Sequence, residues 1–156
     1  MLNLEIATEE CSSNLSKLAY CSEAYWGYDK EYMDKFSKYY NVTKDFIRKN
    51  PSYLLKSDDQ IIGFFGLQES EQNWQLEFFY IVVECIGKGY GQKLWNGLLD
   101  VCKEKHINKF EFVTSPQAVP FYKKMGAQIV GKEISLLQED RVIPKLSYSI
   151  TIARLK

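Results

Sequence analysis

The segment Ile86-Gly87-Lys88-Gly89-Tyr90-Gly91-Gln92 alternates glycine with larger residues. Glycines at every second position remove side chains and permit positive φ, so consecutive backbone N–H groups can converge on one anion. The helix expected to follow adds unpaired N–H groups and the positive end of its dipole. Lys88 adds a full positive charge. The segment therefore predicts a cradle for a diphosphate, although the same glycines would also suit a tight connection that binds nothing.

The spacing of these glycines differs from two common phosphate-binding motifs. The dinucleotide fingerprint G-x-G-x-x-G would place its third glycine one residue later. The P-loop needs Ser or Thr after Gly-Lys and an earlier glycine at position 82, but Gly89 follows Gly87-Lys88 and position 82 is valine. A nucleotide-phosphate module of either kind is therefore disfavoured.

The elements on either side of the glycines must position the cradle. Before it, the apolar run from Leu76 to Val83 is rich in β-branched and aromatic residues, which predicts a strand buried on both faces. After it, residues 93–105 place Leu94, Leu98 and Val101 on one stripe, which predicts an amphipathic helix facing a sheet. The predicted order is strand, glycine turn and helix.

Glu77 is the one charged residue in this predicted central strand. A carboxylate there is costly unless it is paired, hydrated or catalytic, and burial would raise its pKa toward the range of a general base. It is equally well explained as a solvated carboxylate near the start of the strand, because it lies only a few positions after Asn73.

The remaining sequence predicts an α+β fold in the order β, helices, β, β, β, α, β, α, β, β. Further strands are expected at 2–7, 52–56, 60–67, 110–114, 127–135 and 146–153, and further helices at 12–25, 30–40, 43–48 and 118–125. Polar connections are expected at 57–59, 68–73 and 138–144. Pro120 suits the first turn of its helix, and Gly126 suits the C-terminal end. Residues 1–156 contain no repeat or linker and are predicted to form a single domain.

The charge balance excludes some classes of partner. Twenty basic and twenty acidic side chains cancel, which argues against nucleic acid or an anionic membrane surface as the main partner. No apolar run approaches the roughly 20 residues of a membrane span. The first residues lack the basic region of a signal peptide, so a cytoplasmic location is predicted.

The sequence offers few residues that could form a metal site or a catalytic triad. The four cysteines have no C-x-x-C spacing and the only histidine is His106, so no metal site and no Ser-His or Cys-His triad is predicted. Cys11, Cys21, Cys85 and Cys102 are expected to be core thiols in a reducing compartment. His106 is expected in the last turn of its helix, where it would have a structural role.

The glycine segment and the order of elements resemble the GNAT superfamily of N-acetyltransferases. The acyl-CoA loop of that family has the pattern Arg or Gln, two residues, Gly, one residue, Gly or Ala. Its two glycines match Gly89 and Gly91, and Ile86 stands at the Arg/Gln position.

Three other stretches extend the resemblance. SPQAVPFYKKMGA at 115–127 is similar to a family segment with a Phe-Tyr pair and a terminal glycine, while AYWGY at 24–28 and RVIP at 141–144 look like a bacterial subgroup. The resemblance covers essentially the whole chain. It implies a GNAT-like acyl-CoA N-acyltransferase fold, with a central mixed, mostly antiparallel sheet of about seven strands flanked by helices.

The resemblance implies that acetyl-CoA, the acyl donor, binds in a V-shaped gap between the fourth and fifth strands. The fourth-strand backbone would hydrogen-bond the pantetheine arm and the thioester at Phe79, Tyr80, Ile81, Val82 and Val83. The amides that would hold the diphosphate are those of Ile86, Gly87, Lys88, Gly89, Tyr90, Gly91 and Gln92. Gln117, which replaces a frequent family Asn, would complete the site with Phe121 and Tyr122.

The resemblance also implies direct transfer of the acetyl group to an amine. Tyr122 matches the position from which many family members protonate the coenzyme A thiolate, and a phenol with pKa about 10 is protonated at neutral pH. The alternative interpretation is that Tyr122 is a helix tyrosine that only packs beside Phe121. In some relatives a glutamate on the fourth strand is the base, directly or through water, and Glu77 is the corresponding candidate.

The acceptor pocket would be built by the early helices. The candidate residues are Glu23, Tyr25, Trp26, Tyr28 and Tyr32, which could wall a pocket for an amine or an aromatic ring. For Tyr25 and Trp26, a place in the core is the favoured interpretation, and Glu23 is otherwise an ordinary surface carboxylate. Arg141 either closes over the ligand or faces water.

The predicted function is acetyl-CoA-dependent N-acetylation of a primary amine of a small molecule or peptide, by a monomer or homodimer. The alternative is a domain of the same fold that binds an acyl-CoA without turnover, as a sensor or interaction module. Ile86 and Gln117, which depart from the family pattern, keep this alternative open.

Overall fold

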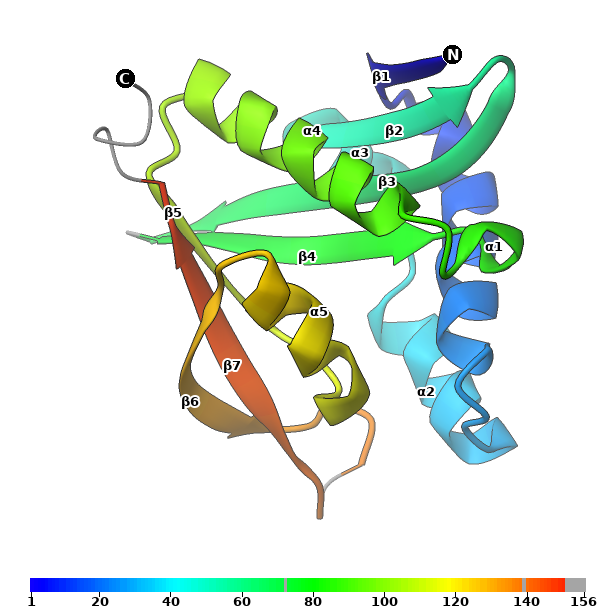
Figure 1. Cartoon of the computed structure of the whole chain (residues 1–156). Helices are drawn as coiled ribbons and strands as arrows, with labels where there is room; N and C mark the ends of the chain where they lie inside the picture. The colour runs from blue at the N-terminus through cyan, green and yellow to red at the C-terminus, as the bar shows by residue number, and fades with distance from the viewer. Residues whose placement is uncertain (72, 139, 151–156) are drawn as a thin grey trace.

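The computed structural model describes residues 1–71, 73–138 and 140–150. Within them, seven strands form a sheet in the order β1-β2-β3-β4-β5-β7-β6 (Figure 1). The strands are β1 Leu2–Ile6, β2 Ser52–Ser57, β3 Gln60–Ser70, β4 Asn73–Ile81, β5 Lys109–Val113, β6 Gln128–Ile134 and β7 Val142–Ser149. Only β4 and β5 pair in parallel. The predicted α+β fold with a mixed, mostly antiparallel sheet is confirmed.

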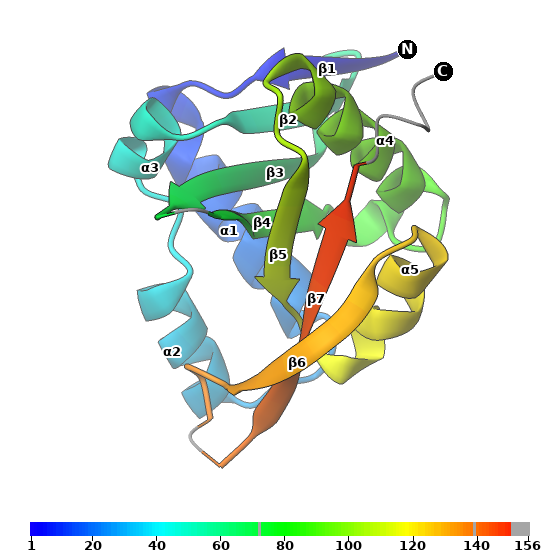
Figure 2. The same ribbon diagram turned by 90° about the vertical axis from the view of Figure 1, so that its left-hand side faces the viewer.

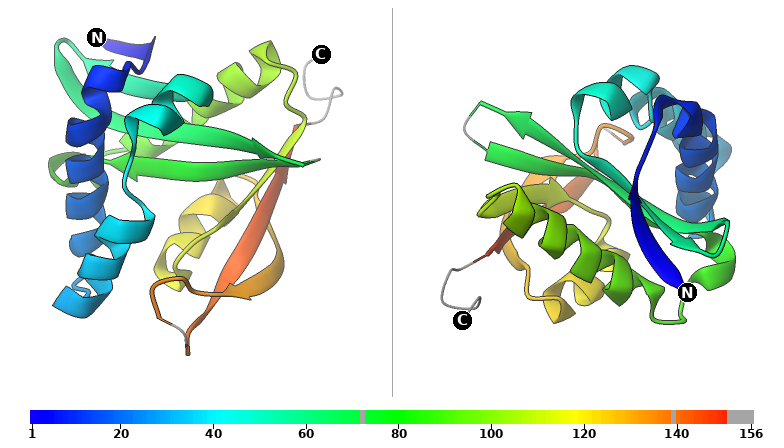
Figure 3. Two further views of the ribbon diagram at one scale, coloured as in Figure 1. Left: turned by 180° about the vertical axis from the view of Figure 1, so that it is seen from behind. Right: turned by 90° about the horizontal axis from the view of Figure 1, so that it is seen from above.

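Helices cover both faces of the sheet, as Figure 3 shows in its view from above. They are α1 Ser12–Ala24, α2 Lys30–Tyr39, α3 Lys44–Lys49, α4 Tyr90–Glu104 and α5 Val119–Lys124. The core under α4 and α5 includes Trp95 and Leu98, and the core under α1 to α3 includes Leu15 and Phe36. Because each face has its own apolar core, the sheet is fixed from both sides.

A β-bulge in β4 changes which way its side chains point. Gly66 of β3 pairs with Phe78 and Leu67 pairs with Leu76, which leaves Glu77 as the extra residue. Leu76 consequently packs in the core under α4 and α5, whereas Phe78 packs in the core under α1 to α3. Bulges of this kind bend a strand and re-aim its side chains.

β4 and β5 meet only at one end. Their pairing is limited to Trp74 with Phe110 and Gln75 with Glu111, and the two strands then diverge (Figures 1 and 2). Over the described residues from Leu76 to the end of β4, the strand pairs with β3 alone. The V-shaped gap that the family resemblance implies is therefore present.

Divergence of these strands also corrects one prediction. Leu76 and Phe78 are the buried residues of β4, and the other side chains of the strand are half-buried or exposed. A strand buried on both faces was the expectation, but one flank of β4 lines a cavity instead of contacting a neighbouring strand.

Several element boundaries differ from the sequence predictions. The expected polar connection at 68–73 is mostly strand, because Ser70 still pairs with Asn73 in the β3–β4 hairpin. Likewise β7 begins at Val142, which pairs with Ile134 of β6, and the predicted strand residues 151–153 lie outside the described part. Polar side chains at 68–70 concealed the extension of β3, since pairing at a hairpin needs only the backbone.

The predicted helix at 93–105 begins earlier and ends earlier. Gly89 adopts φ 85° and caps the helix, so α4 starts at Tyr90. His106 was expected in its last turn, but the helix ends at Glu104 and His106 follows it with φ 61°. A residue in this left-handed conformation terminates a helix.

Candidate active site

The glycine segment forms the turn that its sequence predicts. Gly87 and Gly89 have φ of 82° and 85°, values that side chains other than glycine rarely adopt. The N-cap Gly89 provides no side-chain hydrogen bond to the first helical turn of α4. The backbone N–H groups of that helical turn therefore face the glycine segment without a side-chain cap. A Cβ on Gly91 would lie 3.0 Å from Cε1 of Phe121, so α5 packs directly on the start of α4.

A cavity of about 680 Å³ begins at this turn and follows β4 toward the early helices. Its walls come from β4, the glycine turn, α5, α1, α2 and the β6–β7 segment. Ligand sites in proteins occupy roughly 300–1,000 Å³, so the cavity is large enough for the reactive end of a coenzyme together with an acceptor.

One wall of the cavity is the edge of β4 from which β5 has diverged. Phe79, Tyr80 and Ile81 line it. The backbone on this side of β4 has no neighbouring strand, and such an edge binds an extended chain through main-chain hydrogen bonds.

Tyr122 lies at the floor of the cavity, on α5. It is buried against aromatic rings, with its centroid 4.6 Å from that of Phe112 and 5.1 Å from that of Phe121. Its hydroxyl makes no hydrogen bond to any described residue. Burial, reinforced by the negative charge of Glu23, raises the pKa of Tyr122 above its usual range. The phenol therefore keeps its proton and has it available to donate.

Glu77 lines the same cavity from the bulge of β4. The carboxylate is half-buried, and no described residue forms an ion pair or hydrogen bond with it. Burial raises the pKa of Glu77 above the ordinary carboxyl value, which moves this group toward proton exchange near neutral pH.

Glu23 and Tyr32 form a hydrogen-bonded pair on the opposite wall. The Tyr32 hydroxyl donates to Oε2 of Glu23 at 2.6 Å. Burial raises the pKa of Glu23, while the Tyr32 hydrogen bond and the charge of Arg141 partly counteract that effect. Because Glu23 also raises the pKa values of Tyr80 and Tyr122, its carboxylate lies within electrostatic reach of the cavity floor.

Tyr28 connects the early helices to the segment before α5. Its hydroxyl donates to Oγ of Ser115 at 3.0 Å and accepts a hydrogen bond from the amide of Gln117. Its ring stacks on Tyr32 with centroids 3.9 Å apart, and the guanidinium of Arg141 lies 5.5 Å from its centroid. Arg141 thus lies half-buried over Tyr28, and whether it closes over the ligand stays a prediction.

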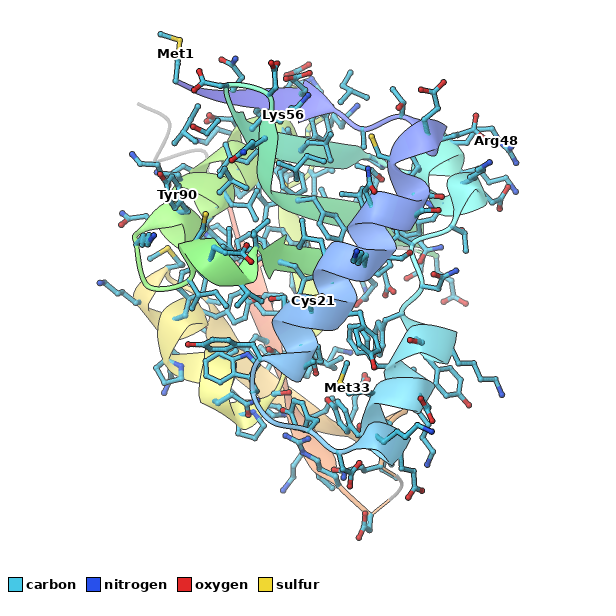
Figure 4. The ribbon with its side chains drawn as sticks, turned by 90° about the vertical axis from the view of Figure 1, so that its right-hand side faces the viewer. Met1, Cys21, Met33, Arg48, Lys56 and Tyr90 are labelled. Carbon is cyan, nitrogen blue, oxygen red and sulfur yellow. The ribbon has the colours of Figure 1, made fainter. Side chains whose placement is uncertain are left out.

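The structure brings most of the predicted site residues to one cavity. Those that line it are Glu23, Trp26, Tyr32, Glu77, Phe79, Tyr80, Ile81, Ile86, Gly87, Gly89, Gly91, Gln92, Gln117, Phe121 and Tyr122. Those that do not are Tyr25, Tyr28, Val82, Val83, Lys88 and Tyr90. Tyr90 lies at the start of α4 (Figure 4). Lys88 is exposed beside the turn, from which its charge acts at longer range.

The core interpretation of Tyr25 and Trp26 is wrong. Their side chains are 52% and 51% exposed, and their rings meet edge to face 5.2 Å apart. The chain leaves the end of α1 here and turns at Gly27, which has φ 86°, so both rings stand outside the sheet packing.

Sequence reasoning missed two walls of the cavity. One comprises Phe36 and Tyr39 on α2 together with its C-cap residue Tyr40, an aromatic pattern that is equally typical of a core. The other runs from residue 133 to 137, together with Ile143. No local motif marks that second wall, because only the pairing of β6 with β7 brings it beside β4.

No group of three metal-ligating side chains occurs among the described residues, and none of the described helices is long and apolar enough to cross a membrane. The cysteines differ from their expected core role, since only Cys102 is buried and Cys21 is exposed on α1 (Figure 4).

The model of the acetyltransferase (GNAT) domain family matches residues 19–135. The chain belongs to the GNAT family of acetyltransferases. This GNAT enzyme is an N-acetyltransferase, and acetyl-CoA is its acyl donor, as the resemblance of the glycine segment implied.

Solved structures agree with the GNAT fold. The PaiA N-acetyltransferase of Thermoplasma acidophilum, in complex with coenzyme A, superimposes with a TM-score of 0.79 and 18% identity over 96% of this chain and 99% of that chain. A GCN5-related N-acetyltransferase of Rhodopseudomonas palustris superimposes with a TM-score of 0.79 and 13% sequence identity over 95% of each chain. An aminoglycoside 6′-N-acetyltransferase complexed with coenzyme A superimposes with a TM-score of 0.74 and 14% sequence identity over 97% of each chain. A search of curated proteins finds no match.

Proposed function

We propose that this GNAT enzyme transfers an acetyl group from acetyl-CoA directly to a primary amine of a small molecule or peptide. The observation that carries the proposal is the continuity of the cavity: it runs from the uncapped amides of the glycine turn, along the unpaired edge of β4, to Tyr122. A coenzyme has its anionic, amide and thioester groups in that same order.

The main chain would bind the donor. The amides of residues 86–92 and the positive end of α4 suit the diphosphate, and the free edge of β4 at residues 79–81 suits the amides of the pantetheine arm. The structures of the PaiA N-acetyltransferase and the aminoglycoside 6′-N-acetyltransferase, which share this fold, contain coenzyme A. Departure of Ile86 from the family pattern costs little when backbone N–H groups make the contacts.

Glu77 and Tyr122 would move the protons. The amine nitrogen attacks the thioester carbon, a C–N bond forms and the C–S bond breaks. Glu77, directly or through a water molecule, takes the proton that the amine loses, and the Tyr122 phenol donates a proton to the departing thiolate. The raised pKa of Glu77 suits a base, because burial makes the carboxylate more basic. Tyr122 is protonated at neutral pH and so has a proton to donate.

The proposal is tested by calorimetry with acetyl-CoA and by release of free thiol with a panel of primary amines. We expect acetyl-CoA to bind and at least one amine to be acetylated. In Tyr122→Phe the affinity for acetyl-CoA should stay within about twofold, while kcat falls by roughly ten- to a thousandfold, the range of a lost general acid.

Tyr53→Phe is a matched control, because this tyrosine stacks on Phe65 in the core outside the cavity. Equal effects of the two variants on kcat would refute the acid role of Tyr122. Binding of acetyl-CoA with no turnover of any amine would favour a non-catalytic acyl-CoA sensor.

A further inference from the structure

We propose that the acceptor is a cationic amine carrying an extended apolar group, and that this group lies between α1–α2 and the β6–β7 hairpin. The inference deepens the function proposed above and rests on it. Three observations support it: the charges inside the cavity, the apolar side chains around its mouth, and the contrast between two halves of one exposed strand.

Charge in the cavity is predominantly negative. Among the described residues, Glu23, Glu77 and Glu133 line the cavity, and Lys124 is the one cation that does so. Glu133 is already paired with Lys145 at 3.3 Å. Glu23 accepts a hydrogen bond at one oxygen only, which leaves the other to accept from an ammonium group.

This charge distribution selects among amines. A protonated amine gains from the carboxylate of Glu23, whereas an acceptor with its own carboxylate is repelled by it. Arg141, whose charge acts on Glu23, does not itself line the cavity and lies over Tyr28. An amino acid is therefore expected to be the poorer acceptor, since its carboxylate would be repelled by Glu23 while Arg141 is already engaged with Glu23 and Tyr28.

The mouth of the cavity is apolar on two sides. On one side Trp26 and Tyr39 are 51% and 50% exposed, and on the other side Ile134 and Leu136 are 67% and 60% exposed. Large apolar side chains left open around a cavity mark a surface that an apolar ligand covers. They offer few hydrogen-bond partners, so a hydroxyl-rich amine would lose water without compensation.

β6 provides an internal comparison. Ile129 and Val130 are also exposed, at 48% and 54%, but they do not line the cavity. If the apolar character of β6 served only contact with another protein, both halves of the strand would behave alike. If the acceptor covers the mouth, Ile134 at the end of β6 and Leu136 just after the strand affect acceptor binding, and Ile129 and Val130 do not.

A set of three amines tests the chemistry of the acceptor: 2-phenylethylamine, phenylalanine and glucosamine. The first is cationic and apolar, the second adds a carboxylate, and the third is rich in hydroxyls. With acetyl-CoA saturating, we expect kcat/KM for 2-phenylethylamine to exceed that for glucosamine by roughly 10- to 100-fold, the equivalent of burying one ring or aliphatic side chain. It should also exceed kcat/KM for phenylalanine, which has the same ring but a carboxylate that Glu23 repels.

Three variants locate the site. Ile134→Ser combined with Leu136→Ser should raise the KM for 2-phenylethylamine by roughly tenfold, whereas Ile129→Ser combined with Val130→Ser should leave it within about twofold. Glu23→Gln should raise the same KM and reduce the preference for 2-phenylethylamine over phenylalanine. None of the three should change the affinity for acetyl-CoA by more than about twofold.

The outcomes separate the two proposals. No binding of acetyl-CoA by the wild-type protein overturns the proposed function and this inference together. Binding and turnover with a preference for phenylalanine or glucosamine overturns this inference and leaves the acetyltransferase in place. Equal effects of the two double variants on KM also overturn it, because the mouth would then have no special role.

Discussion

The two halves of the proposed active site, one for the donor and one for the acceptor, present different kinds of chemical group. On the donor side, the glycine turn, the start of α4 and the edge of β4 present backbone amides and carbonyls. On the acceptor side, α1, α2 and the β6–β7 segment present side chains, among them Glu23, Tyr32 and Leu136. One region depends on where glycine permits the chain to turn, and the other on which side chains distant segments bring together.

This difference suggests how the molecule tolerates change. A backbone site is insensitive to most side-chain substitutions, since each residue retains its N–H and C=O groups. A site made of side chains is altered when one of those side chains is substituted. We therefore expect substitutions to change the preference for the acceptor more readily than the affinity for acetyl-CoA, and the following variants test that difference.

The largest effect is expected from Gly89→Asp. At φ 85° an aspartate is strained, and its carboxylate would repel the diphosphate, so affinity for acetyl-CoA should fall by at least about 100-fold. Gly27→Asp is matched in conformation, because Gly27 has φ 86° and a Cβ added at either glycine would meet no atom within 4 Å. Calorimetry should show that the control keeps its affinity for acetyl-CoA. A similar loss in both variants would mean that strain, and not the turn, causes it.

Glu77→Gln should reduce kcat by roughly 10- to 1,000-fold at neutral pH without weakening acetyl-CoA binding. In the wild type, the rate should fall as pH drops through the raised pKa of Glu77, because only the ionised carboxylate accepts a proton. This acidic limb should therefore lie above the ordinary carboxyl pKa and disappear in the variant. A limb that survives unchanged in Glu77→Gln belongs to another group.

Burial of Glu77 also predicts a change in stability. Its folded-state pKa is raised, so its favourable contribution is complete below the unfolded pKa of about 4.3 and is lost as pH rises through the folded value. Glu77→Gln should consequently have a higher Tm than the wild type at pH 7, and the difference should shrink at low pH. Thermal unfolding at several pH values measures it.

The smallest effect is expected from Tyr28→Phe, which tests the boundary between the two halves. Losing the hydrogen bonds to Ser115 and Gln117 should destabilise the fold by about 0.5–1.5 kcal/mol per bond at most. We expect the KM of the acceptor to rise several-fold and that of acetyl-CoA to stay constant. An equal rise in both would show that the halves are coupled through Tyr28.

Sequence reasoning predicted the glycine turn and its flanking elements for a physical reason. Positive φ at Gly87 and Gly89 is a local property, and the strand, turn and helix follow one another in the chain, so spacing alone locates the site. The roles of the individual residues stay predictions until they are tested. What the sequence could not show was the bulge at Glu77, because a single extra residue depends on the pairing with β3.

The acceptor side was recovered only in part. A place in the core was favoured over a place in the pocket for Tyr25 and Trp26, but the turn at Gly27 leaves both side chains exposed. The wall at residues 133–137 escaped notice altogether. Its approach to α2 depends on contacts between residues almost a hundred positions apart in the chain, which no local pattern records.

The packing of Phe121 against Gly91 has one more consequence. A pantetheine arm has a fixed covalent length, so the amides that would grip its phosphate end and the phenol that would meet its sulfur must stand at a matching interval. Because α4 and α5 touch at Gly91, and Trp95 of α4 also meets Tyr122 of α5, that interval is set mainly by the contacts between these two helices. The spacing that the donor needs is thus built largely into the second half of the chain, and away from Tyr28 the first half can change around a new amine with little effect on it.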